Sequence, residues 1–342
     1  MHYMNFHRIA GQKCITNTPE KTAIMRFFLD RAWQRHSLET ITRETGLTAA
    51  AAVEGILELN TEGARIGHPE PHVYYFEPVE NRLHPDGIAA HLATRWWGRR
   101  IWIGEEITST LEIADALSLQ VKHHGTVIAA DFQTQGRGRF GSAWVSHKGK
   151  DILLTFLIEN PPWEPSASLL SLYAATAVAR VLDTVYRLPI AVKWPNDLSV
   201  DGKKLGGVLV QWDDRHKRLL VSLGLNVHSS PLDWPGEWRN HTVSLSMLKK
   251  EDWQREVLIA QCGTTWETLW ESMMQDRGET VKGYWIQYSA TLGKTVSLTA
   301  RGKNVLGTAR TLDDSGRLVI AGEDGTEYAL LPEEVQKLKV LE

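Results

Sequence analysis

The chain has 342 residues, enough for about two or three domains of ordinary size. Hydrophobic residues make up 42% and charged residues 23%, and the net charge of -3 comes without an acidic or basic block, so bulk charge does not indicate nucleic acid as a partner. The two cysteines, Cys14 and Cys262, fit neither a metal spacing nor a disulfide framework. We expect a cytoplasmic protein without membrane association, because the N-terminus lacks a signal-peptide core and the apolar runs are too short to span a bilayer.

The first part of the chain divides at Pro19. Residues 1 to about 18 show no periodicity, and we expect a loosely ordered extension there. From Pro19 the apolar residues recur at three to four positions, which predicts a helix. Ser37 can cap a second helix that Gly46 ends, and Thr48 can cap a third. This third helix would turn inward Val53, Ile56, Leu57 and Leu59.

Two short apolar runs, 64–67 and 73–76, flank a turn that contains two prolines. Three helices followed by a hairpin predict a winged helix-turn-helix over residues 19–78. A helix that reads DNA needs cations for phosphates and amides or arginines for base edges. Residues 48–62 instead contain Glu54, Glu58 and Glu62 and no Lys or Arg. A role in packing or protein contacts therefore competes with DNA binding.

A linker-like stretch, 78–85, leads into mixed strands and helices over 86–275. A helix is expected over 86–95, and strands over 100–103 and 126–130. Ser109, Thr110 and Leu111 stand where a strand gives way to a helix. The two hydroxyls either cap that helix or face a ligand.

Two arginines lie between glycines in the stretch from Gln133 to Trp144, QTQGRGRFGSAW. Glycines allow close approach to a ligand, and arginine offers a fixed charge and planar donors for carboxylates or phosphates. We interpret the stretch as a cationic loop over an anion, with a solvated hairpin loop as the plainer alternative. The spacing Gly136-x-Gly138-x-x-Gly141 also matches a dinucleotide fingerprint, which requires a helix directly after the loop. The apolar run 152–158 predicts a strand instead.

A second polar cluster follows the helix expected over 166–188. Residues 191–198, AVKWPNDL, run from a strand into a turn that brings together Lys193, Asn196 and Asp197. A hairpin turn is predicted at 201–204, and adjacent glycines in the return strand 205–210 suggest close approach of a ligand or backbone. The next strand, 219–226, ends at Asn226.

The last part of the chain predicts a long helix over 253–274, followed by a change to strands separated by Gly- and Asp-rich turns. We expect a small all-β barrel over residues 290–342. Its strands are predicted at 296–300, 305–312, 318–321 and 328–331.

In combination these motifs resemble the biotin protein ligase family. Four blocks carry the resemblance: GRGR at 136–139, KWPNDL at 193–198, GKKLGGVLV at 202–210 and GLNV at 224–227. The resemblance covers residues 20 to 340, and the combination is much more specific than any single block. It implies the long bacterial form of the family, with an α+β architecture: an N-terminal winged helix-turn-helix, a central mixed-sheet α/β ligase domain and a C-terminal SH3-like β-barrel.

The family resemblance implies a reaction in two steps that uses biotin, ATP and Mg²⁺. The biotin carboxylate attacks the α-phosphate to give biotinyl-adenylate, and a lysine of a biotin carboxyl carrier protein then displaces AMP. Such chemistry requires charge stabilisation and exclusion of water more than an enzyme nucleophile. By position in the motifs, the catalytic residues are Arg137, Arg139 and Lys204; biotin is bound by Ser109, Thr110, Leu111, Gln133, Arg137, Gly138, Arg139, Lys204, Gly206 and Gly207; ATP is bound by Lys193, Asn196 and Asn226, with Asn196 also on the metal.

The sequence departs from the family pattern at several positions. Leu111 stands where Asn is usual, Ser222 replaces a glycine, and Thr242 lies near the place of an aromatic residue over adenine; Phe140, Asp151 and Gln211 also differ. Four functions stay open: a ligase alone, a bifunctional ligase and biotin-responsive repressor, a lipoate-protein ligase and a degenerate ligand-binding scaffold. The family also suggests a homodimer.

Overall fold

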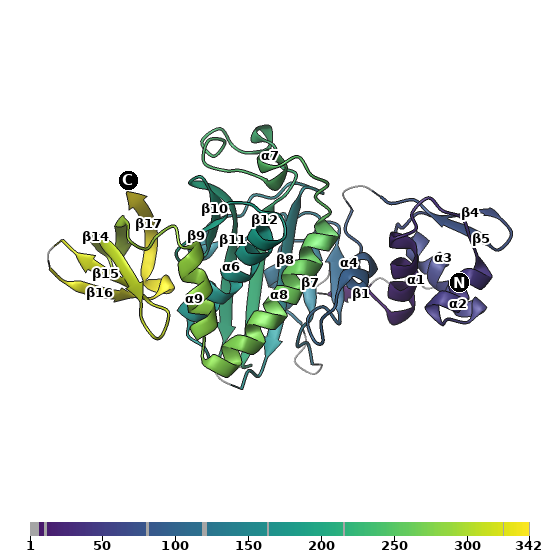
Figure 1. The fold of residues 1–342 in the computed structure, drawn as a ribbon, viewed down its shortest axis with the longest axis horizontal. Helices are drawn as coiled ribbons and strands as arrows, with labels where there is room; N and C mark the ends of the chain where they lie inside the picture. Colours follow the sequence, from purple (N-terminus) through teal and green to yellow (C-terminus); the bar gives the residue numbers. More distant parts are fainter. Residues whose placement is uncertain are drawn as a thin grey trace.

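The computed structural model describes residues 7–9, 12–79, 82–117, 122–162, 164–214, 216–323 and 325–341. Three bodies of secondary structure lie in a row (Figure 1): a helical N-terminal unit, a central sheet covered by helices, and a C-terminal unit made of strands. The fold is thus mixed α+β, as predicted. No helix in the described part of the chain combines the length and the apolar character needed to cross a membrane.

The N-terminal unit contains three helices, α1 (Pro19–Leu29), α2 (Leu38–Thr45) and α3 (Ala49–Thr61). A small antiparallel sheet completes it, in the order β3 (His36–Ser37), β5 (Val73–Phe76), β4 (Ile66–Glu70). The predicted helix ends are confirmed: the Ser37 hydroxyl accepts from the Thr40 amide, the Thr48 hydroxyl accepts from the Ala51 amide, and Gly46 has φ 73°.

One prediction for α3 is wrong. Leu57 is 55% exposed, whereas Ile56 and Leu59 are buried. The inward face of the helix is set by Ala52, Gly55, Ile56 and Leu59, and a residue next to Ile56 is turned by about 100° from it. Gly55 belongs to that face because a Cβ there would lie 2.6 Å from the Ile24 side chain.

The expectation of a loosely ordered extension before Pro19 is also wrong for the described residues. Strands β1 (His7–Ile9) and β2 (Gln12–Thr16) form a hairpin, and β2 pairs with the central sheet through Ile15 and Ile103. Residues 1–6, 10 and 11 lie outside the described ranges. Cys14 and Ile15 of β2 are buried, and a strand of five residues is too short to show a period.

The central sheet has nine strands in the order β1-β2-β6-β7-β8-β12-β11-β10-β9. Its pairs are antiparallel except β6 with β7, which makes the sheet mixed. The strands predicted from sequence are present, at β6 (Ile101–Gly104), β7 (Val127–Ala130), β8 (Asp151–Glu159), β9 (Ala191–Lys193), β11 (Lys203–Asp213) and β12 (Arg218–Asn226). Strand β10 (Asp197–Val200), which begins inside the predicted turn, forms the first arm of the hairpin with β11.

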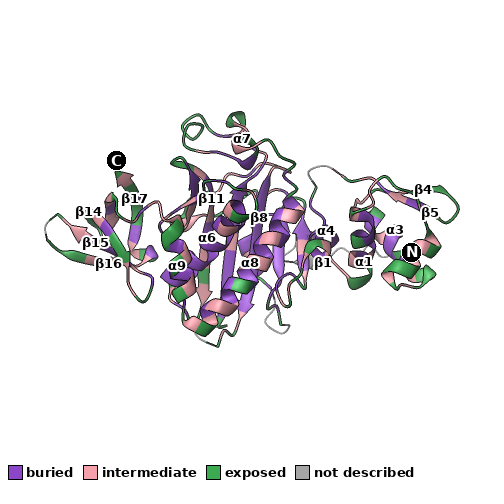
Figure 2. Cartoon of the chain, in the orientation of Figure 1, coloured by how far each residue is buried: buried purple, intermediate pink, exposed green. Residues whose placement is uncertain are grey.

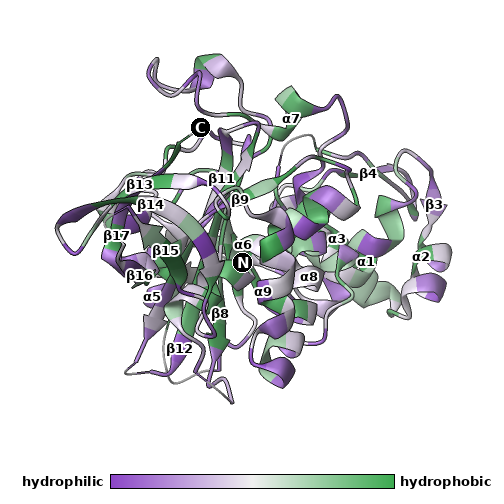
Figure 3. Ribbon diagram, turned by 60° about the vertical axis from the view of Figure 1, so that its left-hand side comes forward, coloured by the Kyte–Doolittle hydropathy of each residue, from purple (hydrophilic) through white to green (hydrophobic). Residues whose placement is uncertain are grey.

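Helices cover the sheet on both faces. Against one face lie α6 (Ala167–Thr184), α8 (Arg255–Asp276) and α9 (Glu279–Tyr288), with α4 (Pro85–His91) beside them. Helix α6 and the middle strands are mostly buried (Figure 2), and the hydrophobic residues gather on those strands (Figure 3). The short helix α5 (Thr110–Asp115) packs on the opposite face. The sequence did not indicate α9 or the short helix α7 (Leu245–Leu248).

The C-terminal unit is an all-antiparallel β domain in the order β16-β15-β14-β13-β17. Four strands match the prediction, β13 (Thr295–Ala300), β14 (Lys303–Leu312), β15 (Leu318–Gly322) and β16 (Glu327–Leu330). The fifth, β17 (Val335–Leu341), was not predicted, because Gln336, Lys337 and Lys339 leave few apolar positions along it. Its Leu338 belongs to the same hydrophobic core as the central sheet.

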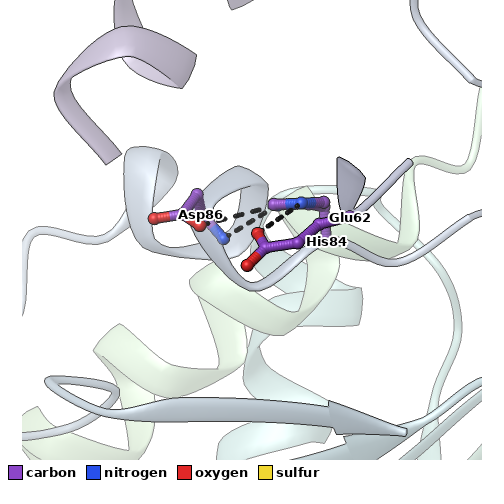
Figure 4. Close-up of side chains that lie close together, drawn as sticks. All are labelled: Glu62, His84 and Asp86. Carbon is purple, nitrogen blue, oxygen red and sulfur yellow. Dashed lines mark hydrogen bonds and ion pairs between the residues drawn. The ribbon is translucent and has the colours of Figure 1, made fainter. Parts of the chain in front are cut away.

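A buried ionic network joins the N-terminal unit to the central body. The Lys21 ammonium in α1 donates to both carboxylate oxygens of Glu62 at 2.7 Å and to the Thr16 carbonyl at 2.9 Å. The His84 ring, at the start of α4, lies 3.5 Å from the Glu62 carboxylate and 3.7 Å from the Asp86 carboxylate (Figure 4). Asp86 also accepts from the Thr18 amide and the Thr22 hydroxyl. The N-terminal unit is therefore fixed against α4 at the start of α1 and at the end of α3.

Candidate active site

A cavity of about 660 Å³ lies on the α5 side of the sheet, within the size range of small-molecule sites. Its wall combines the start of α5, the arginine-containing loop, the middle of β11 and β12 and the start of β17. The lining residues are Ser109, Thr110, Leu111, Gln133, 137–144, Asn196, Asp197, Lys204, 207–209, 222–224, Gln336 and Lys337.

The start of α5 gives the cavity a polar end. Ser109 occupies the N-cap position of α5 but makes no capping hydrogen bond with its side chain, although it is only 1% exposed. Ser109 lines the cavity, and its hydroxyl is not used to cap the helix. The Gln133 side-chain oxygen accepts from the Thr110 amide at 2.7 Å and from the Thr110 hydroxyl at 3.1 Å.

The loop after Gln133 forms a tight turn across the cavity. The Trp144 amide donates to the Gly136 carbonyl at 2.9 Å, and the Gly138 amide donates to the Ser142 carbonyl at 2.7 Å. Phe140 has φ 53° and is 57% exposed, with the Arg139 guanidinium 4.9 Å from its ring centre. The next regular element after this turn is β8, so the helix required by a dinucleotide fingerprint is absent from this described stretch.

The residues just after the loop anchor it to the sheet. The Ser146 hydroxyl accepts from the Gln133 amide and donates to the Gln133 carbonyl. The His147 ring contacts the Asp151 carboxylate through Nδ1 at 3.3 Å and the Asp233 carbonyl through Nε2 at 2.8 Å. The hydrogen bond to Asp151 raises the pKa of His147 above its ordinary value, against the lowering effect of burial.

The two loop arginines have different surroundings. Arg137 is half-exposed and pairs with Glu112 of α5. Arg139 donates to the Val335 carbonyl at 3.0 Å and to the Pro332 carbonyl, and its other terminal nitrogen lies 3.4 Å from the Asn196 side-chain oxygen. Burial lowers the pKa of Arg139, while the carboxylates of Asp197 and Glu333 raise it. An arginine keeps its charge under such conditions, so Arg139 brings a partly desolvated cation to the cavity.

The β10–β11 hairpin supplies a second cation. Asp201 and Gly202 have φ 49° and 74°, which forms the predicted tight turn. The Lys204 ammonium pairs with the Asp197 carboxylate at 2.7 Å and lies 5.7 Å from the centre of the Trp144 ring. The Asn196 amide nitrogen donates to the Val208 carbonyl at 2.6 Å, which leaves its oxygen toward Arg139.

The structure brings most of the predicted site residues to this one cavity. Gly206, Lys193 and Asn226 do not line it. A Cβ at Gly206 would lie 2.7 Å from the Gly224 carbonyl, so this glycine allows strand pairing. Burial lowers the pKa of Lys193, and the Asn226 amide donates to the Val243 carbonyl. The predicted residues that do line the cavity are Ser109, Thr110, Leu111, Gln133, Arg137, Gly138, Arg139, Asn196, Lys204 and Gly207.

Several lining residues were missed by sequence reasoning. Trp144 lies against Gly224, where a Cβ would come within 2.4 Å of the indole. The glycine inside a strand was the available signal for this contact. Lys337 reaches the cavity from β17, far away in the sequence, and no local pattern marks it. Ser222 was noted only as a departure from the family pattern.

Two groups of described residues contain side chains that can bind a metal ion. Among the described residues, Glu62, His84 and Asp86 come close enough together to share one, but the Lys21 ammonium already occupies the Glu62 carboxylate. In the cavity, the Asn196 oxygen has only the long contact to Arg139. The Asp197 carboxylate beside it is paired with the Lys204 ammonium at 2.7 Å, so the Asn196 oxygen is the available ligand for Mg²⁺, which keeps few protein ligands and binds phosphates.

Comparison with known proteins gives matches along the chain. The Biotin/lipoate A/B protein ligase family matches residues 103–228, and the Biotin protein ligase C terminal domain matches residues 291–336. The bifunctional ligase/repressor BirA of Bacillus subtilis is 26% identical over 84% of this chain and 89% of its own length. The human biotin–protein ligase is 30% identical over 71% of this chain and 35% of its own. Biotin protein ligase from Aquifex aeolicus in complex with biotin and ATP has a similar structure, with a TM-score of 0.63, 26% identity and coverage of 70% of this chain and 99% of that one.

Proposed function

The chain belongs to the biotin protein ligase family, and from this premise we propose that the cavity under the arginine loop forms biotinyl-adenylate from biotin and ATP. One observation carries the proposal: Arg139 and Lys204 reach the same cavity as the polar pair Thr110–Gln133. A cavity with cations on one side and a polar end on the other suits a ligand with a carboxylate at one end and polar atoms at the other.

The first step is a displacement at the α-phosphorus of ATP. A biotin carboxylate oxygen attacks, the bond to the pyrophosphate oxygen breaks, and pyrophosphate leaves. Negative charge on the reacting phosphate is best stabilised by fixed cations in a site sheltered from water. Arg139 is partly desolvated, and Lys204 is oriented by Asp197 at 2.7 Å. We assign both as catalytic, with Arg137 contributing once it leaves Glu112.

The second step transfers the acyl group. A neutral lysine amine of the carrier protein attacks the biotinyl carbonyl carbon, the bond from that carbon to the adenylate oxygen breaks, and AMP leaves. The mixed anhydride supplies the activation, so the chain needs to supply position and protection. The turn held by the Trp144 and Gly138 hydrogen bonds would cover the anhydride from water.

The nucleotide would lie toward Asn196 and Lys337, at the side of the cavity nearest the C-terminal domain. We also propose that Lys193 and Asn226 bind ATP from positions next to this side of the cavity, although neither residue lines it. Mg²⁺ would be held by Asn196, with Asp197 beside it, and would supply charge neutralisation on the triphosphate.

Biotin is preferred over lipoate on two grounds. The matched family includes ligases for both acids, but the C-terminal match is to the biotin protein ligase C terminal domain. The dithiolane ring of lipoate would also leave the polar groups of Ser109, Thr110 and Gln133 without hydrogen-bond partners, and buried polar groups without partners cost free energy.

The test is direct. Purified protein is incubated with ATP, Mg²⁺ and either biotin or lipoate, and the products are read by mass spectrometry. We expect formation of biotinyl-adenylate, and ATP-dependent labelling of a biotin carboxyl carrier protein with biotin that releases AMP. Formation of lipoyl-adenylate but not biotinyl-adenylate would overturn the proposal, and so would the absence of both adenylates.

A second function, repression, rests on the N-terminal unit. We propose that residues 19–78 form a winged helix-turn-helix, residues 86–275 the ligase domain and residues 290–342 an SH3-like barrel. The Bacillus subtilis relative is named a ligase/repressor. In this chain, however, α3 carries Glu54 and Glu58 and no Lys or Arg. A gel shift at low salt with the biotin-operon promoter and biotinyl-adenylate tests the role; we expect weak or no binding.

Self-association belongs to the same proposal. We propose a homodimer through the central sheet on family grounds alone. Light scattering with and without biotinyl-adenylate tests it, and a monomer under both conditions would contradict it.

A further inference from the structure

A line of side-chain hydroxyls runs beneath the cavity and joins two of its lining residues, Thr110 and Ser222. Thr155 of β8 is completely buried and stands opposite Ser222 of β12 in the strand register. The Thr155 hydroxyl is 2.8 Å from the Ser222 hydroxyl and 2.9 Å from the Thr110 hydroxyl. The Thr110 hydroxyl in turn lies 3.1 Å from the Gln133 side-chain oxygen. Three hydroxyls therefore form one chain that ends at Gln133.

The proton direction in this chain is fixed at the Gln133 end. The Thr110 amide can only donate, so the atom of Gln133 that it faces at 2.7 Å is the oxygen. That oxygen can only accept, so the Thr110 hydroxyl donates to it. Thr155 must then donate to Thr110. Because a hydroxyl has one proton, the Thr155 oxygen can bond to Ser222 only as an acceptor.

The consequence is a defined polarity at the cavity wall. Ser222 lines the cavity, its proton is directed into the sheet toward Thr155, and only its lone pairs remain for a ligand. Gln133 also lines the cavity, and its oxygen is engaged with Thr110, so its amide nitrogen remains as a donor. The floor thus offers an acceptor at Ser222 and a donor at Gln133.

We propose that Ser222 is a specificity-determining residue that accepts a hydrogen bond from a ureido N–H of biotin, and that Thr155 is the positioning residue that turns the Ser222 lone pairs toward it. A ureido group presents N–H donors beside a carbonyl acceptor, which complements this pair. The proposal rests on the proposed function and adds to it a contact that a glycine at position 222 could not make.

The same polarity works against ligands without a donor at this end. A dithiolane ring has no N–H for the Ser222 lone pairs and no carbonyl for the Gln133 amide. Both groups would be left unpaired when such a ligand excludes water, which is the strongest kind of discrimination a pocket can offer. Ser222 therefore contributes to the choice of biotin over lipoate.

Binding by calorimetry, with the full chain and without ATP, tests the contact. The ligands are biotin and its two analogues methylated at one or the other ureido nitrogen. For Ser222→Ala we expect about three- to tenfold weaker binding of biotin, the effect of one hydrogen bond. For one of the two methylated analogues, the wild type and Ser222→Ala should bind equally, because the N–H that Ser222 accepts from is gone.

Two further variants separate positioning from structure. Thr155→Val keeps the shape of the side chain and removes its hydroxyl. It should weaken the binding of biotin as much as Ser222→Ala does, and it should leave the affinity for the same methylated analogue unchanged. Thr176→Val is the matched control, because Thr176 is also completely buried but its hydroxyl has no hydrogen-bond partner and does not line the cavity. Ser222→Gly serves as the second variant if Ser222→Ala does not fold.

The outcomes are distinct. Equal weakening of biotin and of both methylated analogues would overturn the proposal, as would unchanged biotin binding in Ser222→Ala. Formation of biotinyl-adenylate by the wild type is measured in the same preparations. If the wild type forms adenylate and Ser222→Ala binds biotin normally, the inference fails and the proposed function stands.

Discussion

The guanidinium of Arg139 donates to the main-chain carbonyl of Val335 at 3.0 Å, although 196 positions separate the two residues. A second bond from the same side chain reaches the Pro332 carbonyl. Both carbonyls belong to the segment that leads into β17, so the loop over the cavity is held by the C-terminal domain. An anionic ligand must compete with neutral carbonyls for this cation, and charged acceptors form the stronger hydrogen bonds.

Removal of either assigned cation should slow adenylation. In Arg139→Ala and Lys204→Ala a charge-assisted contact to the reacting phosphate is lost, which costs about 1.5–3 kcal/mol and corresponds to a rate about ten- to a hundredfold lower. The measurement is pyrophosphate release under single-turnover conditions. Lys203→Ala is the matched control, because this exposed neighbour does not line the cavity. Near-normal rates in both test variants would refute the role assignment.

Gly224 should tolerate no side chain. In Gly224→Ala the new methyl would lie 2.4 Å from the Trp144 indole, so the tryptophan and the loop behind it must move. Overpacking of this kind costs about 1–3 kcal/mol, and we expect biotin binding to weaken by about tenfold. Gly236→Ala, where nothing lies within 4 Å of the added methyl, should bind biotin normally. Calorimetry on both variants decides; equal affinities would contradict the packing role.

The ionic network between the N-terminal unit and α4 should be sensitive to loss of one partner. Lys21 is 2% exposed and Glu62 is 7% exposed. Lys21→Met leaves a buried carboxylate without its cation, and such a change costs about 3–5 kcal/mol. Urea unfolding, followed by tryptophan fluorescence, measures the loss in the free energy of unfolding. The double variant Lys21→Met/Glu62→Leu should recover much of the loss, and additive losses would show that the pair is not coupled.

Stability should depend on pH through His147. The contact with Asp151 raises the pKa of His147, so protonated His147 stabilises the folded state. This contribution is complete below the unfolded pKa of about 6.5 and is lost as the pH rises through the raised folded pKa. The free energy of unfolding of the wild type should therefore exceed that of His147→Gln more at pH 6 than at pH 9. His241→Gln, at an exposed position, is the control. A difference independent of pH would disprove the linkage.

Sequence patterns predicted the long elements well. The helix caps at Ser37 and Thr48 and the turn at Asp201-Gly202 depend on the chemistry of neighbouring residues, so they could be predicted from the sequence alone. Strands β2 and β17 were not predicted: β2 has only five residues, too few for a period, and β17, at the edge of its sheet, has charged or polar side chains at Gln336, Lys337 and Lys339. Leu57 was placed inward on hydrophobicity alone, although the face of α3 is set by Gly55 and Ile56.

The residues of the candidate site also fall into two groups, those that the sequence predicted and those that it could not predict. Residues inside contiguous motifs, such as Arg139 and Lys204, were predicted and line the cavity. Lys337 and Thr155 could not be predicted, because their relevance arises only when distant strands lie side by side. Of the adjacent glycines Gly206 and Gly207, only Gly207 lines the cavity, because successive strand residues face opposite sides.

The hairpin that precedes α1 has a practical consequence for shortening the chain. Strand β2 covers the free edge of β6, while the helical unit that follows it lies outside the sheet. A protein cut to begin after residue 82 would lose this cover along with the helices, and an unpaired edge strand invites aggregation. Such a fragment would fail for a reason unrelated to catalysis. A soluble minimal ligase should instead keep residues 12–17 and join them by a short linker to the start of α4.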